Sequence, residues 1–230
     1  MNRRRLLRGI ALSVWALFFW WLAIGDEMTR YLGPRTYWVA WFGAAGLLSA
    51  GVVSLIGTRG AEVRRATRGD VAGALVMLVP IVLVLVLPTP QLGAQAASRK
   101  AVGVGALSSF VPRPDPGGEI GPQEIHYASL SQDYADSLGI VQGLDVELVG
   151  FVTHPGDAMA GDFGLTRFYI SCCAADAVPY TVVIRPAAGE TFPDDTWLKV
   201  EGALLRAGDG FVLDAVDIEP IEEPSAPYLY

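Results

Sequence analysis

An uncharged run of 20 residues, YWVAWFGAAGLLSAGVVSLI, lies at Tyr37–Ile56. An α-helix rises about 1.5 Å per residue, so this run would measure about 30 Å, the thickness of the hydrocarbon core of a bilayer. Two more apolar runs lie at Leu6–Ile24 and Val71–Leu87, and the second of these contains Pro80, which is expected to kink a helix. The sequence therefore predicts three transmembrane helices, at residues 6–24, 37–56 and 71–87.

Two of these runs have an alternative interpretation. Leu6–Ile24 follows three arginines, as a signal peptide would, but its apolar core is long and two more apolar runs follow it, which favours a retained anchor. Val71–Leu87 is short enough for a buried core helix, yet such a helix would carry a polar stripe and this run is apolar all round.

Composition and charge agree with a membrane segment joined to a different kind of domain. Hydrophobic residues make up 52% of the chain and charged residues 18%, which argues against an entirely soluble protein. Residues 1–87 hold 10 basic and 4 acidic residues, whereas residues 88–230 hold 7 and 20. The acidic C-terminal half argues against nucleic-acid binding, and two cysteines are too few for a disulfide framework.

The arginines predict the orientation in the cell membrane. Three of them precede the first apolar run and Arg8 lies at its start, and four more lie between the second and third runs, at Arg59, Arg64, Arg65 and Arg68. Basic residues beside a span tend to stay in the cytoplasm. We therefore expect a cytoplasmic N-terminus, an external loop at Asp26–Thr36 and an extracytoplasmic C-terminal domain.

No ionisable residue lies mid-span, so the chain alone is a poor candidate for a transporter.

A face of small residues in the second run offers a place for close helix packing. Gly43, Gly46, Ala50 and Ser54 recur at helical spacing. We expect this face to pack mainly against another helix of the same chain, although contact with a second protein is an alternative.

Residues 88–122 contain six prolines and several glycines, which is typical of a linker. A short helix is expected next, capped by Ser129 and ended by Gly139. The hydrophobic period then changes to two, the period of β-strands. Five strands are predicted, at Leu144–His154, Leu165–Cys172, Pro179–Pro186, Thr196–Arg206 and Phe211–Pro220.

Five short strands indicate that residues 123–230 form an OB-like, five-stranded antiparallel barrel, in preference to a small sandwich. Gly150 and Gly202 lie inside long strands, where a closing barrel needs a bulge or a sharp coil. The expected fold class is therefore three transmembrane helices followed by an extracytoplasmic all-β domain.

The segment SCCAADA is the most unusual local feature, with Cys172 and Cys173 adjacent and Asp176 three residues beyond. If Cys172 continues the alternation of Phe168 and Ile170, it points into the core, as free cysteines often do. A zinc or copper site of Cys172, Cys173, Asp176 and His154 is a second interpretation. A redox switch is least favoured, because a disulfide between neighbours closes a strained ring.

The sequence shows no nucleophile motif and no phosphate-binding loop, so we expect a protein that is not an enzyme.

Several segments together resemble the YcgQ-like family of predicted permease subunits. The most specific are RFYISCCAADA at Arg167–Ala177 and DDTWLKVEG at Asp194–Gly202, supported by the apolar N-terminal runs, PTPQLG at Pro88–Gly93 and the terminal PYLY. Members are typically encoded beside a YcgR-like predicted permease, and in some bacteria the pair is associated with zinc limitation.

The resemblance implies a non-enzymatic accessory subunit of such a permease, with zinc as the metal that its external barrel would bind. The alternative is a membrane-tethered interaction or assembly module whose barrel binds another protein and whose cysteines belong to the core.

Overall fold

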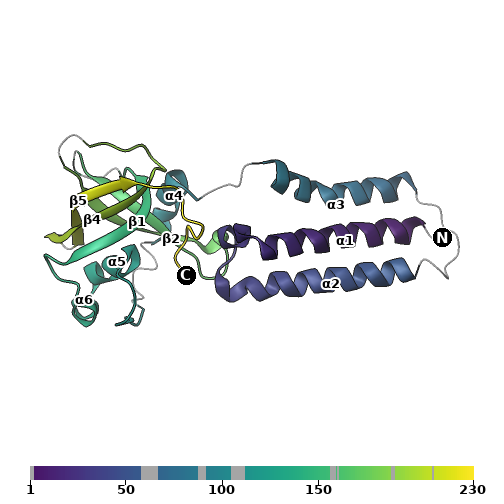
Figure 1. Ribbon diagram of the computed structural model, residues 1–230, viewed down its shortest axis with the longest axis horizontal. Helices are drawn as coiled ribbons and strands as arrows, with labels where there is room; N and C mark the ends of the chain where they lie inside the picture. The colour runs from purple at the N-terminus through teal and green to yellow at the C-terminus, as the bar shows by residue number, and fades with distance from the viewer. Residues whose placement is uncertain are drawn as a thin grey trace. The chain divides into compact units, whose positions relative to one another are not determined.

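The computed structural model describes residues 3–57, 67–87, 92–104, 112–155, 159, 161–187, 190–208 and 210–230. The chain divides into two compact units, Met1–Gln91 and Leu92–Tyr230, and each is described by itself (Figure 1). The first unit is helical, and the second contains every strand of the described chain.

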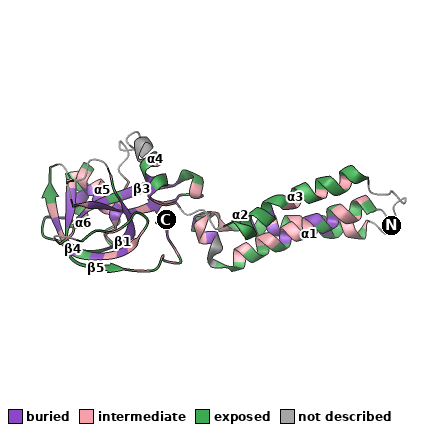
Figure 2. Ribbon diagram, turned by 90° about the horizontal axis from the view of Figure 1, so that it is seen from above, coloured by how far each residue is buried: buried purple, intermediate pink, exposed green. Residues whose placement is uncertain are grey.

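The first unit contains three long helices, α1 (Arg3–Ile24), α2 (Tyr37–Ile56) and α3 (Arg68–Val86). Two short 3-10 helices, η1 (Asp26–Arg30) and η2 (Pro34–Thr36), connect α1 to α2. In the described chain these three helices are the ones long and apolar enough to cross a membrane, which confirms the three predicted helices as candidate spans. Most of their large apolar side chains are exposed, as expected for surfaces that contact lipid (Figure 2).

Helices α1 and α2 approach closely at a pair of glycines. A Cβ atom added at Gly9 would lie 2.7 Å from the Leu55 side chain, and one added at Gly51 would lie 2.8 Å from Ser13 Oγ. A side chain at either position would force Leu55 or Ser13 to shift and would crowd a backbone oxygen 3.3 Å away, so the two glycines favour the close approach of the backbones.

The small-residue face predicted for α2 is not the face that packs in this unit. Ala40, Ala44 and Gly51 are the buried residues of α2, whereas Gly46 is exposed and a Cβ at Gly43 or Gly46 would meet nothing within 4 Å. The spacing identified a real small-residue stripe, but α2 is rich in small residues all round, so spacing alone did not decide which side meets α1.

Helix α3 begins with a capping box and runs on through Pro80. The Thr67 hydroxyl oxygen accepts the Asp70 backbone N–H at 3.2 Å, while Asp70 Oδ2 accepts the Thr67 N–H at 3.1 Å. Trp15 of α1 donates its indole N–H to the Met77 carbonyl oxygen at 2.9 Å, one turn before the proline. A neighbouring helix thus supplies a donor near the place where proline removes one.

The second unit begins with three helices, α4 (Ala94–Val104), α5 (Pro122–Leu130) and α6 (Gln132–Leu138). Helix α4 lies within the stretch expected to be a linker, and its Ala94 and Ala97 are buried. The short helix expected after Ser129 is α6, but its cap is Ser131, whose hydroxyl accepts the Tyr134 N–H at 3.3 Å. Helix α5 precedes it and was not predicted.

Five strands follow, β1 (Asp145–Thr153), β2 (Phe163–Tyr169), β3 (Val178–Arg185), β4 (Trp197–Ala207) and β5 (Gly210–Pro220). They form a closed barrel in the order β1-β2-β3-β5-β4, which confirms the predicted five-stranded barrel. Four pairs are antiparallel, but β3 and β5 are parallel, so the all-antiparallel prediction is wrong at that pair. The direction cannot alternate all the way round a ring with an odd number of strands.

The barrel interior is filled by alternate residues of its strands and by the two helices before them. Ile125 and Ala128 of α5, Ala135 of α6 and the following Ile140 are almost fully buried in the same cluster as Leu148, Leu165, Ile184, Val200 and Leu213. Polar groups inside are paired: the Thr166 hydroxyl, fully buried, lies 2.9 Å from the Thr153 hydroxyl and 2.7 Å from that of Thr181.

Gly202 of β4 lies at the bulge where β4 and β5 change register, as the sequence predicted. A Cβ atom here would collide with the Asp214 carbonyl oxygen of β5. Backbone, unlike a flexible side chain, cannot move aside without disturbing the pairing of the two strands.

We expect Gly202→Ala to lower the free energy of unfolding of the second unit by about 1–3 kcal/mol, because the added methyl group overpacks the bulge. The measurement is urea unfolding of residues 92–230, followed by the fluorescence of Trp197, the single tryptophan in that range. Gly210→Ala is the matched control, since a Cβ there would lie an ordinary 3.6 Å from Ser129 Oγ. Equal stability of the two variants would contradict the prediction.

Candidate metal centre

The segment that holds both cysteines is a short loop between β2 and β3. Pairing of β2 ends at Tyr169, and Ile170 is still buried before the chain turns outward. A single 3-10 turn, η3 (Ala174–Asp176), leads back to Ala177, which is buried again. This agrees with the prediction of no more than one helical turn between the two strands.

The Asp176 carboxylate fixes the shape of this loop. Its Oδ1 accepts the backbone N–H of Ser171 at 3.1 Å, and its Oδ2 accepts that of Cys172 at 2.8 Å. The Asp176 N–H in turn donates to the Cys173 carbonyl oxygen at 3.0 Å. Both oxygens of one side chain therefore hold the chain in the turn that carries the thiols.

The prediction that Cys172 follows Phe168 and Ile170 into the core is wrong. Cys172 is exposed and Cys173 is partly exposed, and neither forms a disulfide. Alternation of side chains holds only while the chain stays extended, and the hydrogen bonds to Asp176 end the strand first. The cysteines are consequently not core residues.

The loop brings three potential ligands together at the surface. The Sγ atoms of Cys172 and Cys173 lie 3.7 Å apart, and a carboxylate oxygen of Asp176 completes a group whose ligand atoms all lie within 4.8 Å of one another. Two sulfurs and one oxygen at this spacing match the donors that zinc accepts, and a tetrahedral ion would leave one position for a further ligand.

The electrostatics of the loop keep the Cys172 thiol protonated. A hydrogen bond to the Asp176 carboxylate and the contact with Cys173 raise the pKa of Cys172 to about 12. Burial raises the pKa of Asp176, but hydrogen bonds from the Cys172 thiol and from backbone N–H groups outweigh it, so the net pKa is lowered. The pair is therefore a neutral thiol donating to a carboxylate, which is the opposite of an activated nucleophile.

His154, the fourth predicted ligand, lies outside this group. Among the described residues the three-ligand group contains only Cys172, Cys173 and Asp176. His154 follows β1, and its Nδ1 lies 2.7 Å from Asp194 Oδ1 in an exposed pair. The structure thus brings together three of the four residues that the sequence suggested.

Helix α4 and the C-terminal segment hold the loop from both sides. Lys100 of α4 donates its ammonium to the Ala175 carbonyl oxygen at 3.0 Å. Ile170 donates its backbone N–H to Leu229 at 3.0 Å, and Leu229 donates to Phe168 at 2.8 Å. A second apolar cluster of this unit lies beneath, in which the rings of Phe151 and Phe168 stack 5.8 Å apart.

The supports from α4 were missed in the sequence because that helix lies between proline-rich stretches. A local pattern in the sequence does indicate this helix: Ala94, Ala97 and Lys100 are spaced three residues apart and so lie on one face of a helix.

The family model of the DUF1980 C-terminal domain matches residues 117–230 of this chain. The match covers α5, α6, all five strands and the cysteine loop, and it begins after the three apolar helices and α4. A comparison with curated proteins gives no match. Residues 117–230 are therefore similar to the DUF1980 C-terminal domain family.

Proposed function

We propose that this chain is a non-enzymatic accessory subunit of a membrane permease, and that its barrel domain binds zinc at Cys172, Cys173 and Asp176. The observation that carries the proposal is the exposed cluster of two thiols and one carboxylate within 4.8 Å. Neither thiol belongs to the two apolar clusters of the domain. A soft or borderline divalent cation is the ligand class that this donor set favours.

The exposure of the cluster indicates a site from which metal is exchanged. Structural zinc sites are closed, with four protein ligands, whereas the described residues supply three and leave one position for water or a further ligand. Binding requires that the thiol protons are released to solvent while Asp176 stays ionised as a ligand, so zinc affinity should rise with pH.

The membrane helices favour an accessory role over transport by this chain alone. Charged residues of α1 and α3 lie near their first turns, and α2 has none. Without ionisable groups at mid-span, the helices offer no polar path for an ion. The resemblance of RFYISCCAADA and DDTWLKVEG to the YcgQ-like family supports a YcgR-like permease as the partner.

The orientation in the proposal rests on the arginines. Arg3, Arg4, Arg5 and Arg8 lie at the start of α1, and Arg68 lies at the start of α3. Ion pairing of Arg4 with Asp70 shows that these two starts lie at the same end of the helical unit. If that end is cytoplasmic, the barrel domain follows the third span on the outside of the cell.

We expect residues 92–230 to bind one equivalent of Zn²⁺ in a titration against a chromophoric chelator at pH 8, with the bound ion coordinated by two sulfurs at about 2.3 Å. The Cys172→Ser, Cys173→Ser double variant should lose at least about 100-fold in affinity, because both soft donors are removed. X-ray absorption spectroscopy checks the sulfur ligands. His154→Ala is the control and should bind as the unmodified domain does, since His154 lies outside the group.

Undiminished zinc binding by the double cysteine variant would overturn the proposed site. Absence of zinc binding by the unmodified domain would favour the assembly module instead.

A membrane-impermeant maleimide added to intact cells at pH 8 should label the chain during a long incubation, because its two cysteines lie in the exposed loop and the loop is proposed to be outside. The raised pKa of Cys172 slows its reaction, since the thiolate is the reactive form. Labelling is measured by the mass shift of the purified chain. The double cysteine variant gives the background, and permeabilised cells give the full extent of reaction. Labelling that appears only after permeabilisation would place the barrel domain in the cytoplasm.

When the full chain and the YcgR-like permease are produced together, we expect the two to remain associated through extraction in a mild detergent and gel filtration. The double cysteine variant should associate equally well, because the proposed contact with the permease does not depend on bound metal. An unrelated membrane protein of similar size is the control. Separate elution under every condition would remove the permease from the proposal.

A further inference from the structure

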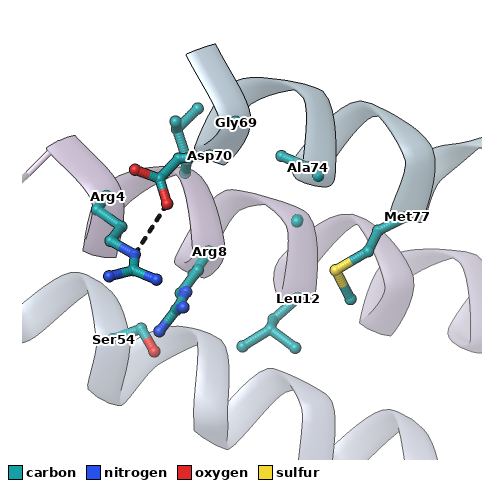
Figure 3. A pocket seen from close by; sticks show the side chains of 11 residues that line it. Arg4, Arg8, Leu12, Ser54, Gly69, Asp70, Ala74 and Met77 are labelled. Atoms are coloured by element: carbon teal, nitrogen blue, oxygen red, sulfur yellow. Dashed lines mark ion pairs between the residues drawn. The ribbon is translucent and has the colours of Figure 1, made fainter. Parts of the chain in front are cut away.

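The first unit contains a cavity of about 530 Å³ between its three helices. Arg4 and Arg8 of α1, Ser54 of α2, and Asp70, Gly73 and Met77 of α3 are among the residues that line it (Figure 3). The cavity lies at the end of the unit where α1 and α3 begin. This is the arginine-rich end, at the depth where a spanning helix meets lipid headgroups.

The charges at the cavity sum to one excess positive charge. Arg4 Nε lies 2.9 Å from Asp70 Oδ1, close enough for an ion pair. The other oxygen of Asp70 is held by the N–H and hydroxyl of Thr67, at 3.1 and 2.9 Å. The cavity is thus lined by one carboxylate and two guanidinium groups, of which Figure 3 shows that of Arg4 paired with Asp70.

Arg4 also lacks a hydrogen-bond acceptor for one of its donors. Its Nε atom is buried, and the ion pair with Asp70 does not have hydrogen-bond geometry, so no described residue accepts this N–H. A buried donor without an acceptor is costly, and an oxygen atom of a bound anion would remove that cost.

The part of the cavity away from the arginines is apolar. Leu7, Leu12, Ala74 and Met77 line it. Gly73 leaves the space open, because a Cβ atom there would meet nothing within 4 Å. The neighbouring outward residues Ile10 and Leu75 are exposed apolar side chains, which is the surface expected next to lipid. A charged opening above an apolar floor fits a phosphate ester that carries hydrocarbon chains.

We propose that this cavity binds the phosphate group of one anionic membrane phospholipid, held by Arg4 and Arg8, with the start of its acyl chains over Leu12 and Met77. A lipid fits better than free phosphate because most of the lining is apolar and the site is proposed to lie at the depth of the headgroups. Two guanidinium groups also match the geometry of phosphate oxygens. The proposal is independent of the metal site and of the permease.

The test uses the full chain in nanodiscs of phosphatidylcholine containing phosphatidylglycerol as the anionic lipid. After transfer to detergent, lipids that remain bound are counted by native mass spectrometry. The unmodified chain should retain one phosphatidylglycerol. The double variant Arg4→Gln, Arg8→Gln should reduce retention of phosphatidylglycerol at least tenfold, because it removes both positive charges. The single variant Gly73→Leu should reduce it by as much, because the leucine side chain fills the apolar part of the cavity.

The matched control is Arg3→Gln, Arg68→Gln, which removes two charges at the same end but none that lines the cavity. Gly73→Leu leaves the Arg4–Asp70 ion pair in place, so it remains informative if the arginine variant fails to fold. Retention that is unchanged in Gly73→Leu, or lost equally in the control, would overturn the proposal. Inorganic phosphate that displaces phosphatidylglycerol at millimolar concentration would identify a free anion as the occupant and would overturn the lipid assignment.

Discussion

The chemistry proposed for this protein depends on one carboxylate that accepts two backbone hydrogen bonds. Asp176 takes the N–H groups of Ser171 and Cys172, and in doing so it ends the extended chain after β2 and turns it toward solvent. Without those bonds the alternation of the strand would carry one thiol inward and the other outward. With them, both sulfurs stand on one surface beside the side chain that positioned them.

The two units differ in how much of their structure the sequence predicts. Hydropathy located all three long helices, because a helix in hydrocarbon must be apolar along its length and must satisfy its own backbone. The period-two pattern located all five strands, and Gly202 marked the bulge. The parallel pair β3–β5 escaped because periodicity carries no information on strand direction, although the odd strand number requires it.

Two predictions from the sequence are wrong for different reasons. One extends the alternation of a strand beyond the end of that strand, and the other infers an irregular linker from proline content alone. The Cys172 side chain would point into the core only if the alternation of β2 continued three residues beyond Tyr169, where the strand ends. The prolines on both sides of α4 predict a linker, although Ala94 and Ala97 pack with Ile170 and Ala177 at the ends of the cysteine loop. The Arg4–Asp70 pair joins residues 66 positions apart, and only folding shows that they meet.

Closure of the barrel also decides how another protein can recognise this domain. In an open sheet the outermost strands present unpaired N–H and C=O groups, and many partners attach by extending the sheet with a strand of their own. Here every strand has neighbours on both sides, in the ring β1-β2-β3-β5-β4. An added strand could therefore pair only where the ring is locally open, as along residues 145–150 of β1, which pair with β4 but not with β2.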